Sequence, residues 1–130
     1  MKPVEYGAHS FYIERYPEGR EATVAWGSLD LRFRNDSGNA IYIDARATDT
    51  SVTVTFLGTK KYDAVEAVKG PRANVKQPGT REGSGDKCVP QTPLEGFNVA
   101  VDRVFKDGGR EVKRETFKTR YVPRDEVTCE

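Results

Sequence analysis

The sequence has few of the residues on which metal sites depend. Its 130 residues include one histidine, two cysteines and one methionine. Structural zinc sites take four ligands, mostly cysteine and histidine at short spacings. A single histidine with two distant cysteines does not supply such a set. The sequence therefore predicts no metal site, and it contains no motif that calls for a cofactor.

An excess of charge of one sign is also missing. Lysine and arginine total 21 and aspartate and glutamate total 20, which gives a net charge of +1. Nucleic-acid-binding domains carry a basic stripe, often with aromatic residues on which bases stack. Neither feature occurs here, so we do not expect nucleic acid as a partner.

No apolar run is long enough to cross a bilayer. The first six residues, Met-Lys-Pro-Val-Glu-Tyr, lack the apolar segment of a signal peptide. Taken literally, these absences predict a cytoplasmic chain without a membrane span. A piece cut from a longer exported protein would look the same, so the expected location depends on other features.

The two cysteines, Cys88 and Cys129, enclose the last part of the chain. A disulfide between them would close that part into a loop and stabilise the fold by about 4 kcal/mol in the chain-entropy model. Disulfides persist in oxidising compartments outside the cytoplasm. Two buried thiols are the alternative. The bonded form is the favoured hypothesis, and it predicts an extracytoplasmic or cell-surface location.

Short runs of alternating apolar and polar residues predict an all-β fold. We expect mostly antiparallel strands and hairpins, arranged as a sandwich or an open barrel, because turn-forming residues separate the runs. The clearest hairpin joins residues 40–46 to residues 51–57. Residues 10–16 predict a further strand, whereas residues 61–68 fit either a strand or one helical turn.

The last hairpin is expected to join the alternating run that begins at Phe97 to residues 111–121. Asp107-Gly108 is a strong local signal for the turn between them. Val112 is out of phase with the later apolar residues of the returning strand, which indicates a bulge. With the disulfide, this unit becomes a closed C-terminal hairpin.

Residues 19–35 predict two short strands about a bend at Gly27-Ser28. Trp26 is the only tryptophan, and its position in the alternation predicts that it anchors the core. Its truncation to alanine would then cost about 3–5 kcal/mol.

The composition divides the chain into three parts. Residues 1–69 form the first β domain, residues 70–96 are rich in proline and glycine and read as a connector, and residues 97–130 form the C-terminal hairpin extension. The extension is expected to pack on the first unit.

Several ordered motifs resemble the C-terminal half of the VanW family, which takes its name from vancomycin-resistance gene clusters. They are His9-Ser10, Tyr16-Pro17-Glu18-Gly19, residues 20–24, residues 30–35 and residues 40–43. Glu21 stands where the family usually has aspartate. The tail from Cys88 to Cys129 is similar to an extension seen in actinobacterial-type members. The resemblance implies an exported or membrane-anchored parent protein with upstream domains.

The resemblance also implies one catalytic candidate. In the family, the histidine at position 9 follows a glycine-rich segment with a cysteine, and that segment is absent from this sequence. His9 could serve such a thiol as general base, or it could simply cap a strand. The enzyme hypothesis is thus a Cys/His enzyme acting on peptidoglycan, whose cysteine lies upstream of these residues.

The second hypothesis is a non-catalytic binding module of the cell envelope, accessory to cell-wall biology or glycopeptide resistance. Its candidate ligand-binding residues are Arg20, Arg32 and Arg34, for which a solvated sheet face is the alternative. The aromatic residues Tyr12, Tyr16, Tyr42 and Trp26 could line a carbohydrate platform, although aromatic residues in strands more often pack in cores. Peptidoglycan or its peptides are the expected partners. We favour this hypothesis because it requires only residues that are present.

Overall fold

The computed structural model describes residues 1–8 and 14–130. His9, Tyr12 and most of the strand predicted for residues 10–16 lie outside the described residues. Residues 14 and 15, at the end of that predicted strand, form a turn.

The described chain is built from strands and contains no helix, which confirms the predicted all-β class. The strands, in chain order, are β1 (Lys2–Glu5), β2 (Arg32–Arg34), β3 (Ile41–Ala47), β4 (Val52–Gly58), β5 (Ala64–Lys69), β6 (Ala73–Lys76), β7 (Thr80–Gly83), β8 (Gly96–Asp107), β9 (Arg110–Tyr121) and β10 (Glu126–Cys129). They form four separate sheets, and every pairing is antiparallel except that of β7 with β10.

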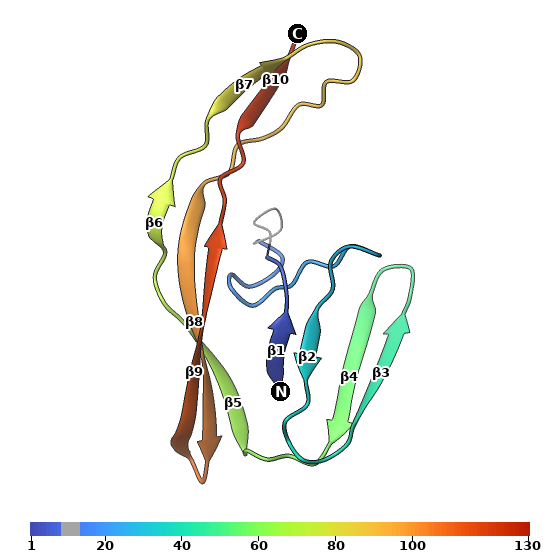
Figure 1. Ribbon diagram of the computed structural model, residues 1–130, viewed down its shortest axis with the longest axis vertical. Coiled ribbons are helices and arrows are strands. Elements are labelled where there is room, and N and C mark those ends of the chain that lie inside the picture. The colour runs from blue at the N-terminus through green and yellow to red at the C-terminus, as the bar shows by residue number, and fades with distance from the viewer. Residues whose placement is uncertain (9–13) are drawn as a thin grey trace.

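The largest sheet is organised around β8 (Figure 1). β9 pairs with β8 along nearly its whole length, which confirms the predicted C-terminal hairpin. Phe105 pairs with Lys113 and Lys106 pairs with Glu111, so Val112 is the extra residue of a bulge, as its phase predicted.

The other edge of β8 is covered by two strands that follow one another in sequence. β5 pairs with the second half of β8 and β6 with its first residues. Between β5 and β6, the Gly70 N–H donates to the Ala100 carbonyl at 2.8 Å, so hydrogen bonds follow this edge of β8 along most of its length. Residues 61–68 therefore supply a strand, not a helical turn. Both β6 and β7 lie within the segment expected to be a connector, and the expected boundary at residue 69 coincides with the end of β5.

The C-terminal tip is a short parallel ribbon of β7 and β10, closed by the Cys88–Cys129 disulfide. The Cα atoms of the two cysteines are 5.8 Å apart. The predicted disulfide is thus confirmed. Figure 1 shows this ribbon as a continuation of the β8–β9 sheet at the end of the long axis.

The N-terminal residues form two hairpin-like pairs beside the large sheet. β1 pairs with β2, and β3 pairs with β4 from Ile41–Gly58 to Ala47–Val52, which confirms the hairpin predicted for residues 40–57. In Figure 1, β3 is the outermost strand of this part, and the space between the two parts faces β1.

Trp26 does not belong to the core, so the prediction for this residue is wrong. Its side chain is 104% exposed. Residues 26–28 form the predicted bend, in which the Leu29 N–H donates to the Ala25 carbonyl at 2.9 Å and Gly27 has φ +78°. The alternation of this segment is real, but Trp26 occupies the tip of the turn, where no described layer of the fold covers it.

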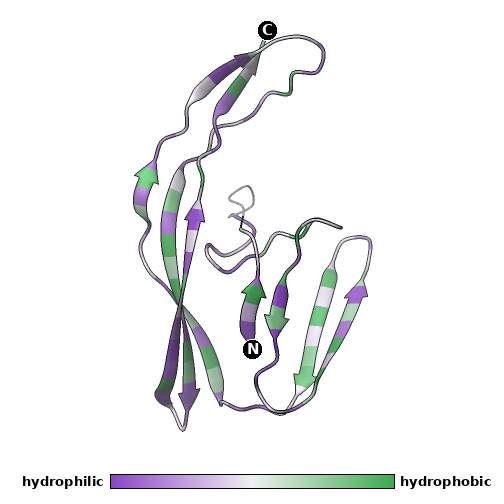
Figure 2. Ribbon diagram, viewed as in Figure 1, coloured by the Kyte–Doolittle hydropathy of each residue, from purple (hydrophilic) through white to green (hydrophobic). Residues whose placement is uncertain are grey.

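The core lies instead on β8 and β9. Its buried apolar side chains are Phe97, Val99, Val101, Val104, Phe105 and Tyr121. Figure 2 shows apolar residues recurring along β8, and a second apolar set on the β3–β4 hairpin. The second set is largely exposed, with Val52 at 75% and Val54 at 52%.

Candidate functional site: a groove between the two parts

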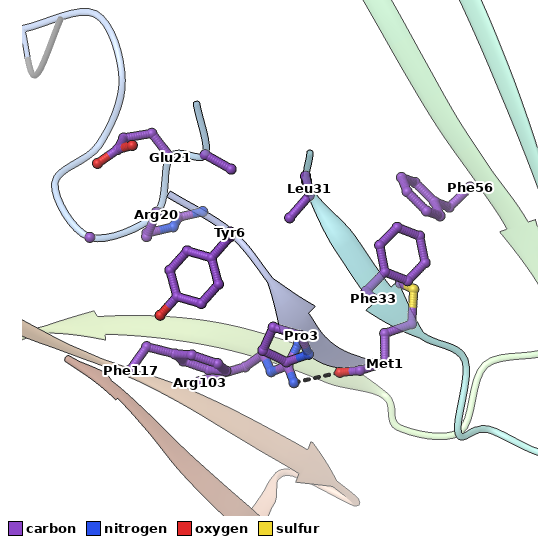
Figure 3. Close-up of a pocket in the computed structure, with 12 residues that line it drawn as sticks. Met1, Pro3, Tyr6, Arg20, Glu21, Leu31, Phe33, Phe56, Arg103 and Phe117 are labelled. Atoms are coloured by element: carbon purple, nitrogen blue, oxygen red, sulfur yellow. Dashed lines mark hydrogen bonds between the residues drawn. The ribbon is translucent and has the colours of Figure 1, made fainter. Parts of the chain in front are cut away.

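A groove of about 300 Å³ lies between the N-terminal strands and the β8–β9 sheet. Its lining comes from β1, β2 and β4 on one side, from the loop at residues 19–22, and from β8 and β9 on the other. The lining residues are Met1, Pro3, Tyr6, Gly19, Arg20, Glu21, Ala22, Leu31, Phe33, Phe56, Arg103 and Phe117. Figure 3 shows these side chains converging on one space.

One end of the groove is apolar. The Phe33 ring of β2 and the Phe56 ring of β4 pack against each other with centroids 6.0 Å apart and planes tilted by 53°. Figure 3 places Met1 beside them and Leu31 on the same side. Because β2 and β4 are not hydrogen-bonded to each other, this aromatic contact helps to hold the two N-terminal sheets together.

The opposite end of the groove is charged, with Arg20 and Glu21 side by side in the chain (Figure 3). Glu21 accepts a hydrogen bond from the Tyr121 hydroxyl. Arg20 is exposed and forms no ion pair with any residue in the described ranges. Its guanidinium is therefore a cation available to a ligand.

Tyr121 fixes the loop that carries these two charges. Its ring is buried, with 2% exposure, and packs on Phe97 with centroids 4.8 Å apart. The hydroxyl donates to Glu21 and accepts a hydrogen bond of 2.8 Å from the Gly19 N–H. Burial first of all, and then the Glu21 carboxylate, raise the pKa of Tyr121 to about 12.

Glu18 anchors the same loop on its other side. Its carboxylate accepts hydrogen bonds from Lys69 Nζ at 3.0 Å and from Arg72 Nε at 3.1 Å, which join the loop to β5 and to the start of β6. The bond from Arg72 above all, and also that from Lys69, lower the pKa of Glu18 although burial acts in the opposite direction. The carboxylate is therefore ionised at neutral pH, and the loop is held between Glu18 and Tyr121.

Arg103 forms the floor of the groove. Its guanidinium donates to the Met1 carbonyl at 2.7 Å and to Glu115 at 3.1 Å, and it lies over the ring of Phe117 at 5.2 Å. These contacts join the start of the chain to the β8–β9 hairpin. Arg103 is thus a structural cation, in contrast to Arg20.

The structure separates the three arginines proposed as ligand-binding residues. Arg20 lines the groove, whereas Arg32 and Arg34 flank Phe33 in β2. Since side chains alternate along a strand, these two arginines lie on the face opposite to Phe33 and the groove. Both are exposed, and Nη1 of Arg32 lies 3.4 Å from Oε2 of Glu5.

The remaining candidates fall elsewhere. Cys88 and Cys129 are joined at the far tip of the molecule, and His9 lies outside the described residues. Of the aromatic platform candidates that are described, Tyr16, Tyr42 and Trp26 are all exposed and none of them lines the groove. The described part of the chain holds no group of three or more histidine, cysteine, aspartate or glutamate side chains positioned to bind a metal ion.

Several groove residues were not singled out from the sequence, namely Tyr6, Phe33, Phe56, Arg103 and Phe117. A signal for one of them was present. Arg103 occupies an inward position in the alternation of Val99, Val101 and Phe105, where a charged residue needs a partner. The other four are aromatic residues whose meeting depends on how separate sheets pack.

These features define a class of protein: an all-β, disulfide-closed chain with a groove between its N-terminal strands and its main sheet. Comparisons with known proteins add the family. Residues 1–57 match the family described as VanW like protein. The predicted resemblance is confirmed, since residues 1–57 are similar to the VanW-like family.

One curated relative is the uncharacterized protein YoaR of Bacillus subtilis strain 168. It is 34% identical over 56 residues, which cover 43% of this chain and 18% of the relative. The chain therefore matches less than a fifth of the length of that relative. No solved structure matches the chain.

Both the disulfide and the family are compatible with a location outside the cytoplasm. A helix long and apolar enough to cross a membrane is not found within residues 1–8 and 14–130.

Proposed function

We propose that this chain is a non-catalytic binding module of the cell envelope, and that its groove holds a peptide or glycan fragment of the cell wall. The observation that carries the proposal is the free guanidinium of Arg20 at one end of a groove whose other end is aromatic. Recognition sites combine a mainly apolar lining with a few placed polar groups in this way. The similarity of residues 1–57 to the VanW-like family supports a role accessory to cell-wall biology or to the response to glycopeptides.

The two ends of the groove suit different parts of one ligand. A carboxylate would accept charge-assisted hydrogen bonds from Arg20, which is planar and suited to bidentate contacts. A small apolar side chain would pack on Phe33 and Phe56. Wall peptides carry both groups on one short chain, so we expect them to bind better than an uncharged glycan.

The cysteine chemistry supports a non-catalytic role. Cys88 and Cys129 are the chain's two cysteines, and their disulfide leaves neither as a thiolate nucleophile. The alternative function, a part of a Cys/His enzyme acting on peptidoglycan, needs a cysteine from outside this sequence and assigns His9 as the base.

The test is calorimetric titration of the purified chain with muropeptides. We expect binding, and we expect Arg20→Ala to weaken it by at least about tenfold, because a hydrogen bond to a charged group contributes about 1.5–3 kcal/mol. Arg32→Ala is the matched control, since it removes the same side chain from the opposite face of β2. Equal losses in both variants, or no binding at all, would contradict the proposed site.

The same mixtures of chain and muropeptides decide between the binding module and the Cys/His enzyme. Products are followed by mass spectrometry after long incubation, and we expect the muropeptides to remain intact. Turnover by the wild-type chain that disappears in His9→Ala would replace the binding-module proposal with the enzyme alternative.

A further inference from the structure

We propose that a second copy of this chain pairs with the free edge of β3, so that two β3–β4 hairpins form one four-stranded sheet. The hairpin is a sheet of only two strands, and isolated two-stranded hairpins are at best marginally stable. β4 lies toward β2 in Figure 1, whereas the outer edge of β3 faces away from the molecule. Within the described residues, β3 pairs with β4 and with no other strand.

The hydrogen-bond pattern shows which backbone groups are free. The Thr48 N–H donates to the Ser51 carbonyl at 2.8 Å, so residues 48 and 51 are a hydrogen-bonded pair at the end of the hairpin. Bonded and non-bonded pairs alternate along an antiparallel ladder. The even-numbered residues of β3 therefore bond to β4, and the N–H and C=O groups of Ile41, Ile43, Ala45 and Ala47 point outward.

The charges of β3 select one register for a second copy. Antiparallel pairing about a two-fold axis at Ala45 sets Ala45 against itself and Asp44 against Arg46 of the other copy. Asp44 and Arg46 already lie on one face, with Arg46 Nε 2.9 Å from Asp44 Oδ2. The two copies would then bring four charges together at the new edge, with the Asp44 of each copy facing the Arg46 of the other. Opposite charges in facing positions stabilise a sheet, and like charges destabilise it.

The neighbouring registers lack this complementarity. An axis at Ile43 sets Asp44 against Tyr42, and an axis at Ala47 sets Arg46 against Thr48. Axes at Asp44 or Arg46 also allow the backbone ladder, but they set Asp44 against Asp44 or Arg46 against Arg46 of the other copy, and facing like charges destabilise a sheet. The Ala45 register is thus the one that satisfies both the backbone and the charges.

The apolar face of the hairpin also favours a symmetric partner. Ile43 pairs with Phe56 and Ala45 with Val54, so this face carries no charge that would repel its own copy. Edge strands are usually protected by lysine, proline or a bulge, and β3 has none of these. Joining two hairpins gives four strands with one continuous apolar face, on which Val54 is 52% exposed and Phe56 46% exposed in the single chain.

The charge pair provides a test by sedimentation equilibrium over a range of concentrations. We expect a monomer–dimer equilibrium for the wild-type chain. Asp44→Arg and Arg46→Asp should each raise the dissociation constant by at least about tenfold, since each creates two like-charge pairs across the axis. The double variant Asp44→Arg/Arg46→Asp restores complementarity and should restore dimerisation. Asp30→Arg is the control for the change in net charge, because Asp30 is exposed and lies outside β3.

A backbone variant tests the edge independently of charge. Proline is tolerated where a strand N–H faces outward, so Ala45→Pro should keep the hairpin and abolish the dimer. Circular dichroism of each variant verifies that it remains folded. A wild-type chain that stays monomeric overturns the proposal. So does a dimer that survives Ala45→Pro, or one that the double charge exchange does not restore.

Discussion

Trp26 shows how exposure alters the expected cost of a substitution. Its side chain projects from the tip of a turn and is fully exposed. Substitutions at such positions usually change stability by no more than about 0.5 kcal/mol. We therefore expect Trp26→Ala to leave the urea midpoint almost unchanged. A loss of several kcal/mol would mean that the side chain is covered after all.

The Tyr121 hydroxyl links the groove loop to the sheet, and its removal has two measurable effects. Tyr121→Phe leaves the Gly19 N–H and the Glu21 carboxylate without their shared partner. We expect a loss of about 1–2 kcal/mol in the free energy of unfolding at neutral pH.

The second effect concerns alkaline pH. The pKa of Tyr121 is raised to about 12 in the folded chain, against about 10 in an unfolded one. Between these values the folded state keeps a proton that the unfolded state has lost, so stability falls as the pH rises through this window. Urea titrations from pH 9 to about pH 12 should show a smaller fall for Tyr121→Phe than for the wild type. If the free energies of unfolding of the two proteins fell in parallel with pH, the assignment of the raised pKa to Tyr121 would be contradicted.

Gly19 combines two reasons for having no side chain. Its φ is +69°, and a Cβ built on it would lie 2.7 Å from Cγ2 of buried Val101. Backbone strain and overpacking together predict that Gly19→Ala loses about 3 kcal/mol. Gly38→Ala is the control, since Gly38 has φ +82° but open space around it, and it should lose only about 1 kcal/mol. Equal losses by chemical denaturation would show that the close packing on Val101 contributes nothing.

At the scale of the elements, the sequence predicted those strands whose partners lie nearby in the chain. Alternation and turn chemistry located the β3–β4 and β8–β9 hairpins, and the phase of Val112 located the bulge. β7 was not predicted as a strand. Its partner, β10, lies far along the chain, and its own residues are dominated by nearby proline and glycine.

The candidate site was predictable only in part for a related reason. Arg20 was singled out as a charged residue, and the groove contains it. Arg32 and Arg34 belong to the same stretch of sequence, but alternation along β2 directs them away from the groove. Phe33 and Phe56 meet through the packing of two sheets, and nothing in either strand alone specifies that contact.

At the scale of the whole molecule, the disulfide should account for much of the stability. The Cys88–Cys129 bond spans a sequence separation of 41. The chain-entropy model therefore predicts a loss of about 4 kcal/mol on reduction. Urea midpoints measured with and without reductant test this, and the Cys88→Ser/Cys129→Ser variant should not respond to reductant. An unchanged wild-type midpoint would contradict the prediction.

The position of the disulfide also determines how the molecule transmits tension. A pull applied to the chain after Cys129 passes through the sulfur atoms to Cys88 and then toward the amino end. The intervening loop contains β8 and β9, which hold the buried core, and it remains outside this path. A chain stretched by its two ends would thus load the main hairpin through the hydrogen bonds of β8 with β5 and β6, and not along the backbone of β8 and β9. Reduction of the bond would release about 140 Å of additional contour length, since an extended residue spans about 3.4 Å.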